Sequence, residues 1–268
     1  MVAADLHVHL YPCYDLPRLL DYAWQNLRRI APNADSTTHL LGLTERWDCH
    51  FFRALSQKTL TVPGWTIDEG RERGVLRLSS LDGKQLWLFA GRQIITAERL
   101  ELLALTADVT VPDGLPFADA HAAVLDQGAL AVLNWAPGKW MFARRPIVEQ
   151  LLKRVEPEAL LICDTTLRPL GWGEPELMRF ARTRGYAVIA GSDPLPFGGE
   201  ESRAGTYGVC LEQGFVEDQP VTSLQTLLRA GRWSYIGARS NPLSAAVRIG
   251  RNELARRRRG SVGDINDT

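Results

Sequence analysis

Residues 117–134, FADAHAAVLDQGALAVLN, contain the pattern that decides the fold class. Phe117–Gln127 predicts a helix that ends at Gly128, because glycine readily adopts the left-handed backbone conformation in which many helices terminate. The apolar run Ala129–Asn134 that follows predicts a buried strand. A helix followed directly by an apolar strand is the repeating unit of α/β proteins.

The same alternation extends over most of the chain. Toward the C-terminus we predict helices at 146–155, 174–184 and 221–230, and strands at 159–163, 186–190 and 207–211. Toward the N-terminus we predict strands at 2–8 and 39–44, helices at 15–30 and 45–55, and a strand-rich segment over 60–107. Apolar strands between amphipathic helices predict a parallel sheet covered on both faces or a closed β/α barrel. About seven strand–helix units can be counted.

Composition excludes several classes of function. The length of 268 residues suits one large α/β domain. Because 31 basic residues balance 31 acidic ones, the chain as a whole does not attract nucleic acid or anionic lipid. The first residues lack the basic and apolar stretches of a signal peptide, and no run of about 18 apolar residues could span a membrane. We therefore expect a cytoplasmic protein with neither a membrane nor a nucleic acid as partner.

The first candidate site is the sequence Asp5-Leu6-His7-Val8-His9. On a strand, alternate residues share a face, so Asp5, His7 and His9 are expected to point in one direction. Two imidazoles placed in this way can bind one divalent cation, and a nearby carboxylate can orient one of them. The alternative is a pair of structural histidines at the end of a strand.

The second candidate site is Gly191-Ser192-Asp193, which follows a late apolar strand. In a β/α barrel the carboxyl ends of the strands form one rim, where catalytic residues gather. Asp193 is therefore expected to meet His7 and His9, although it is distant from them in sequence. The alternative is an Asx-turn or a helix cap, which an Asp before a proline often forms.

These motifs together resemble the PHP (polymerase and histidinol phosphatase) family. Between them, GRQIIT (91–96) is similar to that family's Gly-x-Glu strand, GALAVLNWAP (128–137) to its strand ending in His-Pro, and ICDTT (162–166) to a further strand. The resemblance covers about residues 3–212. It implies a distorted seven-stranded β/α barrel that holds two or three divalent metals and hydrolyses phosphoesters. We therefore expect a barrel over 1–240 and a flexible C-terminal extension over 241–268, with the Arg-rich run Arg256–Arg259.

The chain departs from the family pattern at several ligand positions. His7, His9 and Asp193 match, and Asp15 stands one position late for the family's early Asp. The departures are Glu45 and Arg46 in the family's Thr-Asp-His, Gln93 for a bridging Glu, Asn134 for a His, and Leu195 for a second His. Neutral amides are poor ligands for transition metals. We therefore expect His7, His9 and Asp193 to form a reduced site for one or at most two Zn, Mn, Fe or Mg ions. The alternative is a site that has lost its metal. Asp193, Asp15, Gln93 and Asn134 are the catalytic candidates.

Other side chains are candidates for substrate binding. Lys139, Arg144 and Arg145 lie in or near the aromatic loop 135–140 and could bind a phosphate, and Arg92 is a further candidate cation. The alternative is that they are solvated cations. Asp48 and His50 could be displaced ligands or could decorate a helix, and the Gly-rich loop 194–208 could be a lid or a plain connection.

Three functions remain open from the sequence. The leading hypothesis is a PHP-like phosphoesterase with a reduced metal site, weak activity and a small phosphorylated substrate. The second is a non-catalytic relative that keeps the fold as a binding or scaffold module. The third is an amidohydrolase-type enzyme, which ranks last because the strand that ends in Asn134 lacks the histidine that such enzymes require.

Overall fold

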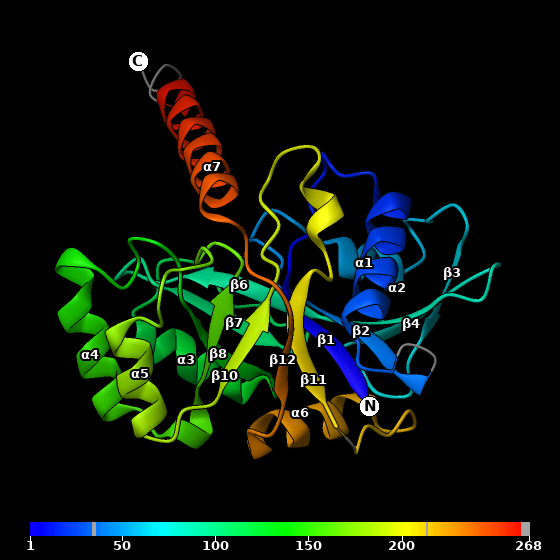
Figure 1. Ribbon diagram of the computed structural model, residues 1–268, viewed down its shortest axis with the longest axis horizontal. Coiled ribbons are helices and arrows are strands. Elements are labelled where there is room, and N and C mark those ends of the chain that lie inside the picture. The colour runs from blue at the N-terminus through cyan, green and yellow to red at the C-terminus, as the bar shows by residue number, and fades with distance from the viewer. Residues whose placement is uncertain (34–35, 213, 264–268) are drawn as a thin grey trace.

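The computed structural model describes residues 1–33, 36–212 and 214–263, with side chains described as far as Ala255. Its strands form two separate mixed sheets (Figure 1). The first has the order β12-β11-β1-β2-β5-β4-β3, and the second has the order β10-β9-β8-β7-β6. The strands are β1 (Val2–Val8), β2 (Thr38–Leu43), β3 (Trp65–Glu69), β4 (Val75–Ser80), β5 (Gln85–Phe89), β6 (Gly91–Ile95), β7 (Glu101–Leu105), β8 (Leu130–Asn134), β9 (Leu161–Thr165), β10 (Val188–Gly191), β11 (Tyr207–Leu211) and β12 (Ser234–Gly237).

The predicted seven-stranded β/α barrel is wrong, because the described strands do not close into a barrel. Parallel pairing is found for β1–β2, β2–β5, β8–β9 and β9–β10, whereas the other neighbours in each sheet are antiparallel. A parallel pair needs a crossover of about a dozen residues or more. Only Ala90 separates β5 from β6, and β6 turns back into β7 within a short hairpin. The strand-rich middle of the chain therefore cannot supply the repeated crossovers of a barrel.

The two sheets meet at their edges as well as through their inner faces. Strand β10 lies at one edge of the five-stranded sheet and contacts β1. Strand β6 lies at the other edge and contacts β2, and its Arg92 forms a bridge with Glu45, which follows β2. A Cβ on Gly91 would come within 2.0 Å of the Leu43 carbonyl oxygen, so this approach requires glycine. Between the inner faces lies a buried core that includes Leu6, Phe89 and Ile189.

The helices lie around the two sheets: most cover an outer face, the sixth packs Leu224 and Leu228 into the core between the sheets, and the last projects from the fold (Figure 1). They are α1 (Leu16–Ile30), α2 (Phe51–Ser56), α3 (Phe117–Asp126), α4 (Arg145–Arg154), α5 (Glu176–Thr183), α6 (Pro220–Ala230) and α7 (Pro242–Gly263). Helix α1 buries Leu19, Ala23 and Leu27 against the seven-stranded sheet, whereas α3, α4 and α5 pack on the five-stranded sheet. Burial of such apolar faces is the main stabilising contribution to the fold.

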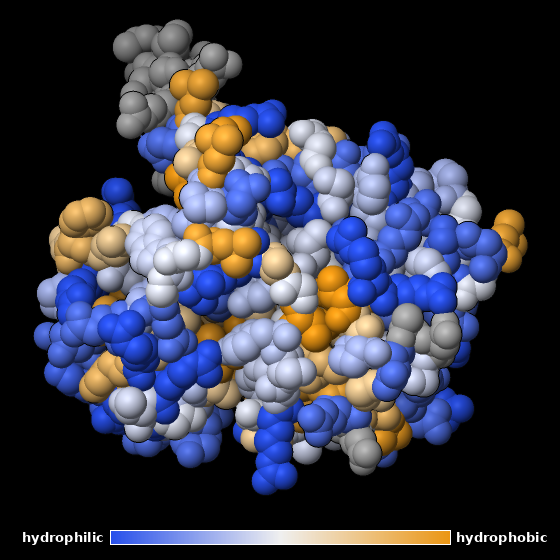
Figure 2. Space-filling model, in the orientation of Figure 1, coloured by the Kyte–Doolittle hydropathy of each residue, from blue (hydrophilic) through white to orange (hydrophobic). Residues whose placement is uncertain are grey.

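Two further expectations need adjustment. The helix predicted over 45–55 forms only as α2, because Glu45 bridges to Arg92 and its Oε1 accepts the backbone N–H of Phe52 at 3.1 Å. The extension expected over 241–268 contains α7, which projects from the rest of the chain in Figure 1. Figure 2 shows apolar side chains on this helix. Leu243, Val247 and Leu254 of α7 are exposed. The expected flexibility of the Arg256–Arg259 run concerns side chains that lie outside those the structure describes.

None of the helices within the described residues is both long and apolar enough to cross a membrane.

Candidate metal centre

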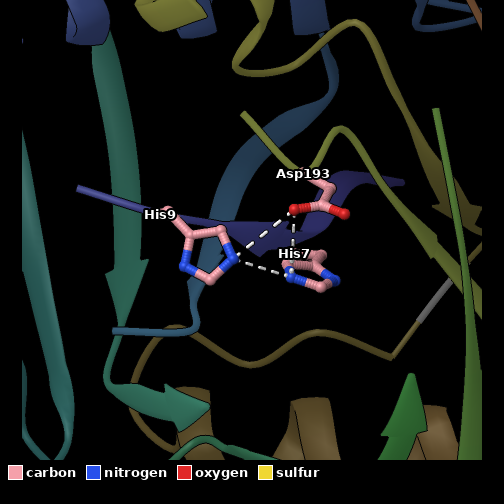
Figure 3. Close-up of side chains that lie close together, drawn as sticks. All are labelled: His7, His9 and Asp193. Carbon is pink, nitrogen blue, oxygen red and sulfur yellow. Dashed lines mark hydrogen bonds and ion pairs between the residues drawn. The ribbon is translucent and has the colours of Figure 1, made fainter. Parts of the chain in front are cut away.

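Three buried side chains from distant parts of the sequence meet beside strand β1 (Figure 3). The Nε2 atoms of His7 and His9 lie 3.0 Å apart. Asp193 Oδ1 lies 3.6 Å from His7 Nε2 and 3.5 Å from His9 Nε2. The convergence predicted for His7, His9 and Asp193 is therefore present, although the fold that produces it is not a barrel.

The positions of His7 and Asp193 depend on a close approach between β1 and β10. A Cβ on Gly191 would lie 2.3 Å from the Cβ of His7, so only glycine permits this contact. The backbone N–H of Asp193 then donates to the carbonyl oxygen of His7 at 2.9 Å. Asp193 itself adopts a φ of 51°, in the left-handed region that non-glycine residues rarely occupy.

Asp5 has a structural role outside the cluster. Its carboxylate accepts hydrogen bonds from the backbone N–H and hydroxyl of Ser192 at 2.9 and 2.5 Å, and from the Gly205 backbone at 2.8 Å. Burial raises the pKa of Asp5 to about 7 in spite of these hydrogen bonds. Asp5 thus joins β1 to the segments that follow β10 and precede β11.

The electrostatics of the cluster favour a neutral imidazole at His7 and an ionised carboxylate at Asp193. Burial lowers the pKa of His7 to about 4, and the attraction of Asp193 only partly opposes this effect. Burial would raise the pKa of Asp193, but His7, His9 and Arg248 together lower it to about 2. Neutral imidazole and ionised carboxylate are the forms that bind metals.

The geometry fits one small divalent cation. Nitrogen and oxygen ligands lie about 2.0–2.2 Å from Zn²⁺, which places tetrahedral ligand atoms about 3.4 Å from one another. The three observed separations are 3.0, 3.5 and 3.6 Å. On the far side of its ring, His7 Nδ1 lies 3.7 Å from the Cys163 thiol, and His9 Nδ1 has no hydrogen-bond partner within the described part of the chain.

A cavity of about 480 Å³ opens over His9 and Asp193. Of the residues predicted from sequence, Gln93, Lys139 and Leu195 line it. The cavity wall also includes Ile249 and Asn252 of α7, so the C-terminal helix forms one side of the site.

Asn134 lies beside His7, close enough to influence the His7 pKa, but does not line the cavity as described. Its Nδ2 donates to Glu101 Oε2 at 2.8 Å, and its buried Oδ1 has no partner among the described residues. Lys139 Nζ lies 3.2 Å from Glu101 Oε1. Glu101 therefore neutralises a cation that was expected to bind substrate.

Other predicted residues lie away from the cluster. Asp15 is exposed and caps α1, accepting the Arg18 backbone N–H at 3.1 Å. Arg145 pairs with Glu176 at 2.7 Å, and Arg144 donates to the carbonyl of Gly138. Arg92 lines a separate, adjacent pocket of about 590 Å³. These positions do not support the roles expected for Asp15, Arg92, Arg144 and Arg145.

Structural roles fit three features for which the sequence left alternatives open: Asp48, His50 and the loop 194–208. Asp48 pairs with Arg46, and His50 precedes α2 as an exposed residue without a side-chain cap. The loop 194–208 is anchored to α1, because Tyr14 donates to the Leu195 carbonyl at 2.6 Å and Asn26 donates to the Ala204 carbonyl at 2.8 Å. These anchors fit a fixed connection better than a lid.

Sequence reasoning missed several residues at the site. Tyr11 stacks on the His9 ring with centroids 5.3 Å apart, and its position two residues after His9, just beyond the end of β1, could have suggested it. Glu101 and Arg248 carry no local signal, because only the tertiary structure brings them near His7 and Asp193.

The chain is similar in fold to the crystal structure of PsfC from Pseudomonas syringae PB-5123, with a TM-score of 0.59 and 17% sequence identity. The similarity covers 95% of this chain and 97% of PsfC. At this level of identity the likeness establishes a shared fold alone. No protein-family model matches the chain. No curated protein matches it either.

Proposed function

We propose that His7, His9 and Asp193 hold one divalent cation, and that the protein is a weak, metal-dependent hydrolase of phosphoesters, similar in kind to the PHP family. The observation that supports this proposal is the placement of three ligand atoms within 3.6 Å of one another, beside a cavity that His9 and Asp193 line. Two neutral imidazoles and a carboxylate are a common ligand set for catalytic zinc.

The surrounding residues support one cation rather than a cluster of two or three. The amides Gln93 and Asn134 stand where a bridging carboxylate and a histidine are expected, and neither can offset the charge of a second ion. Asp15, the other carboxylate in the predicted set, is used as a helix cap. A bound divalent ion would leave the site with a charge of about +1.

The charges around the cavity support weak rather than strong activity. A divalent ion supplies Lewis acidity and makes water a better nucleophile at neutral pH. Stabilising the leaving group of a phosphoester then requires free cations from the protein. Lys139 is paired with Glu101 and Arg46 with Asp48, so the two cations among the described residues that line the cavity are already neutralised.

The pairing of these cations also favours the second candidate, a non-catalytic protein that binds a metal within the same fold. The two candidates agree on the metal and differ only in turnover. We therefore test binding and turnover separately.

The first experiment measures metal content. Purified protein, saturated in turn with Zn²⁺, Mn²⁺ and Fe²⁺ and then desalted, is analysed for metal. We expect near one equivalent of one metal, lost in a His7→Ala/His9→Ala double variant and retained in His50→Ala, whose exposed imidazole lies outside the cluster. Absence of all three metals from the wild-type protein would contradict the proposal. A bound metal without turnover of any phosphoester tested would select the non-catalytic candidate.

A further inference from the structure

Arg248 is a buried cation that belongs to the C-terminal helix yet touches the backbone of the metal-site residue Asp193. The side chain is 3% exposed. Its Nη2 donates to the Asp193 carbonyl oxygen at 2.9 Å. Its Nε donates to both carboxylate oxygens of Glu200, at 3.0 and 2.8 Å. All of these contacts come from one residue of α7, which is remote in sequence from β1 and β10.

The same guanidinium holds the residue that precedes Asp193. Arg248 Nη1 donates to Thr166 Oγ1 at 2.7 Å, and this hydroxyl in turn donates to the carbonyl oxygen of Ser192 at 2.5 Å. The hydroxyl of Ser240, at 3.0 Å, is a further acceptor for Nη1. Two successive carbonyls, those of Ser192 and Asp193, are therefore fixed by Arg248, one directly and one through Thr166.

These contacts lie at a strained position of the backbone, residue 193. Asp193 has a φ of 51°, which is unfavourable for a residue with a Cβ and persists only when surrounding contacts enforce it. In this conformation the Asp193 carboxylate faces His7 and His9 (Figure 3). Glu200, the ion-pair partner of Arg248, also accepts the backbone N–H of Leu195 at 3.1 Å. Hydrogen bonds thus hold the backbone of this segment at Asp193 and again at Leu195.

A purely structural buried ion pair would need only Arg248 and Glu200. Arg248 Nη2, which lies 2.7 Å from Glu200 Oε2, donates in addition to the carbonyl of Asp193, whose carboxylate faces two histidines. In addition, Ile249 and Asn252, which follow Arg248 on α7, line the cavity over His9 and Asp193. The position of α7 and the position of the Asp193 carboxylate are therefore linked through the side chain of Arg248.

We propose that Arg248 is the positioning residue of the metal site: it holds Asp193 in the left-handed conformation that turns its carboxylate toward His7 and His9, and so makes helix α7 part of the site. This inference rests on the proposed function, because it presumes that the three side chains bind a metal. Lysine cannot replace arginine in this role, because a single ammonium cannot reach Glu200, Thr166 and the Asp193 carbonyl with a planar fork.

The test compares Arg248→Lys with the control Arg251→Gln. Arg251 lies on the same helix, is exposed, and has its guanidinium 4.2 Å from the centroid of the Phe197 ring. We measure Zn²⁺ affinity by calorimetry, the absorption spectrum of the Co²⁺-loaded protein, and thermal unfolding of the metal-free protein. We expect R248K to lose about 10-fold to 100-fold in Zn²⁺ affinity, as is typical when a residue supporting a ligand is changed. Its Co²⁺ spectrum should shift toward that of Asp193→Asn, and R251Q should match the wild-type protein.

A folded R248K protein with wild-type affinity and spectrum would overturn the inference while leaving the proposed metal site intact. Failure of the wild-type protein to bind Zn²⁺ or Co²⁺ would instead remove the proposed function, and this inference with it. If R248K does not fold, Glu200→Gln provides the test. The amide still accepts a hydrogen bond but no longer fixes the Arg248 guanidinium by its charge. A loss of Zn²⁺ affinity in this variant supports the inference, and unchanged affinity overturns it.

Discussion

The backbone N–H of Asp193 donates to the carbonyl oxygen of His7 at 2.9 Å, so two residues whose side chains meet are also joined through their main chains. This bond forms where the edge strand β10 of one sheet lies against the central strand β1 of the other. The distance between the imidazoles and the carboxylate is therefore set by the packing of the two sheets.

Gly191→Ala should disrupt this packing. The new methyl group would lie 2.3 Å from His7 Cβ and 2.5 Å from His7 N, and the second atom belongs to the backbone and cannot rotate away. We expect the variant to lose about 1–3 kcal/mol of unfolding free energy, the usual cost of overpacking. Urea unfolding measures this loss. Gly250→Ala on α7 is the control, because a Cβ there meets nothing within 4 Å, and equal stability of the two variants would contradict the expectation.

The unmodified protein should turn over simple aryl phosphates slowly or not at all, even with added metal. A phosphomonoester carries nearly two negative charges at neutral pH, which exceeds the charge of about +1 expected for the loaded site. Release of nitrophenol from p-nitrophenyl phosphate, with each metal in turn, provides the measurement. Robust turnover that is abolished by Asp193→Ala would refute this prediction and establish the enzyme.

Gln93→Glu combined with Asn134→His should raise the metal content above that of the wild-type protein. The two substitutions supply a carboxylate at the cavity and an imidazole beside His7, and so provide charge and basicity for a second ion. Metal analysis of the desalted variant, beside each single variant, tests this expectation. Unchanged metal content would mean that the backbone positions of residues 93 and 134 no longer suit coordination.

Glu45→Gln should change the pH dependence of stability. Burial raises the pKa of Glu45 from 4.5 to about 7, so between these values the folded protein holds a proton that the unfolded chain has lost. The contribution of Glu45 to the unfolding free energy therefore falls as pH rises from about 4.5 to about 7 and is constant above that range. The amide can still accept the Phe52 N–H without ionising.

We therefore expect the stability of the glutamine variant, relative to wild type, to increase as pH rises from 5 to 7. Urea unfolding at pH 5, 6, 7 and 8 measures this difference. Glu69→Gln is the control, because the Glu69 side chain is exposed and bonds only to Ser56 Oγ among the contacts described. A constant difference between Glu45→Gln and wild type across the range would disprove the raised pKa.

The sequence alone predicted much of the local structure and part of the site. Periodic apolar residues located α1, α3, α4, α5 and α6 and most of the buried strands to within a few residues. The two-residue spacing of His7 and His9 predicted that both rings point in one direction, and they do meet, although His9 lies just beyond the end of β1. The position of Asp193 after a buried strand led to the expectation that it would join them. These features depend on residues that are close together in the sequence. The spacing of apolar and polar residues therefore reflects their local backbone geometry.

Only the tertiary structure decided which strands pair, and with that the architecture. Strand pairing joins segments distant in sequence, and an apolar strand has the same composition whether its partner is parallel or antiparallel. The barrel was therefore predicted wrongly, and Asp193 reaches His7 across a seam between two sheets instead of around a rim. The presence of Glu101 and Arg248 at the site was also missed, because it too depends on contacts between segments that are distant in sequence. Each carries a charge that any exposed position would also suit, and only the packing of β7 and α7 places that charge beside the candidate ligands.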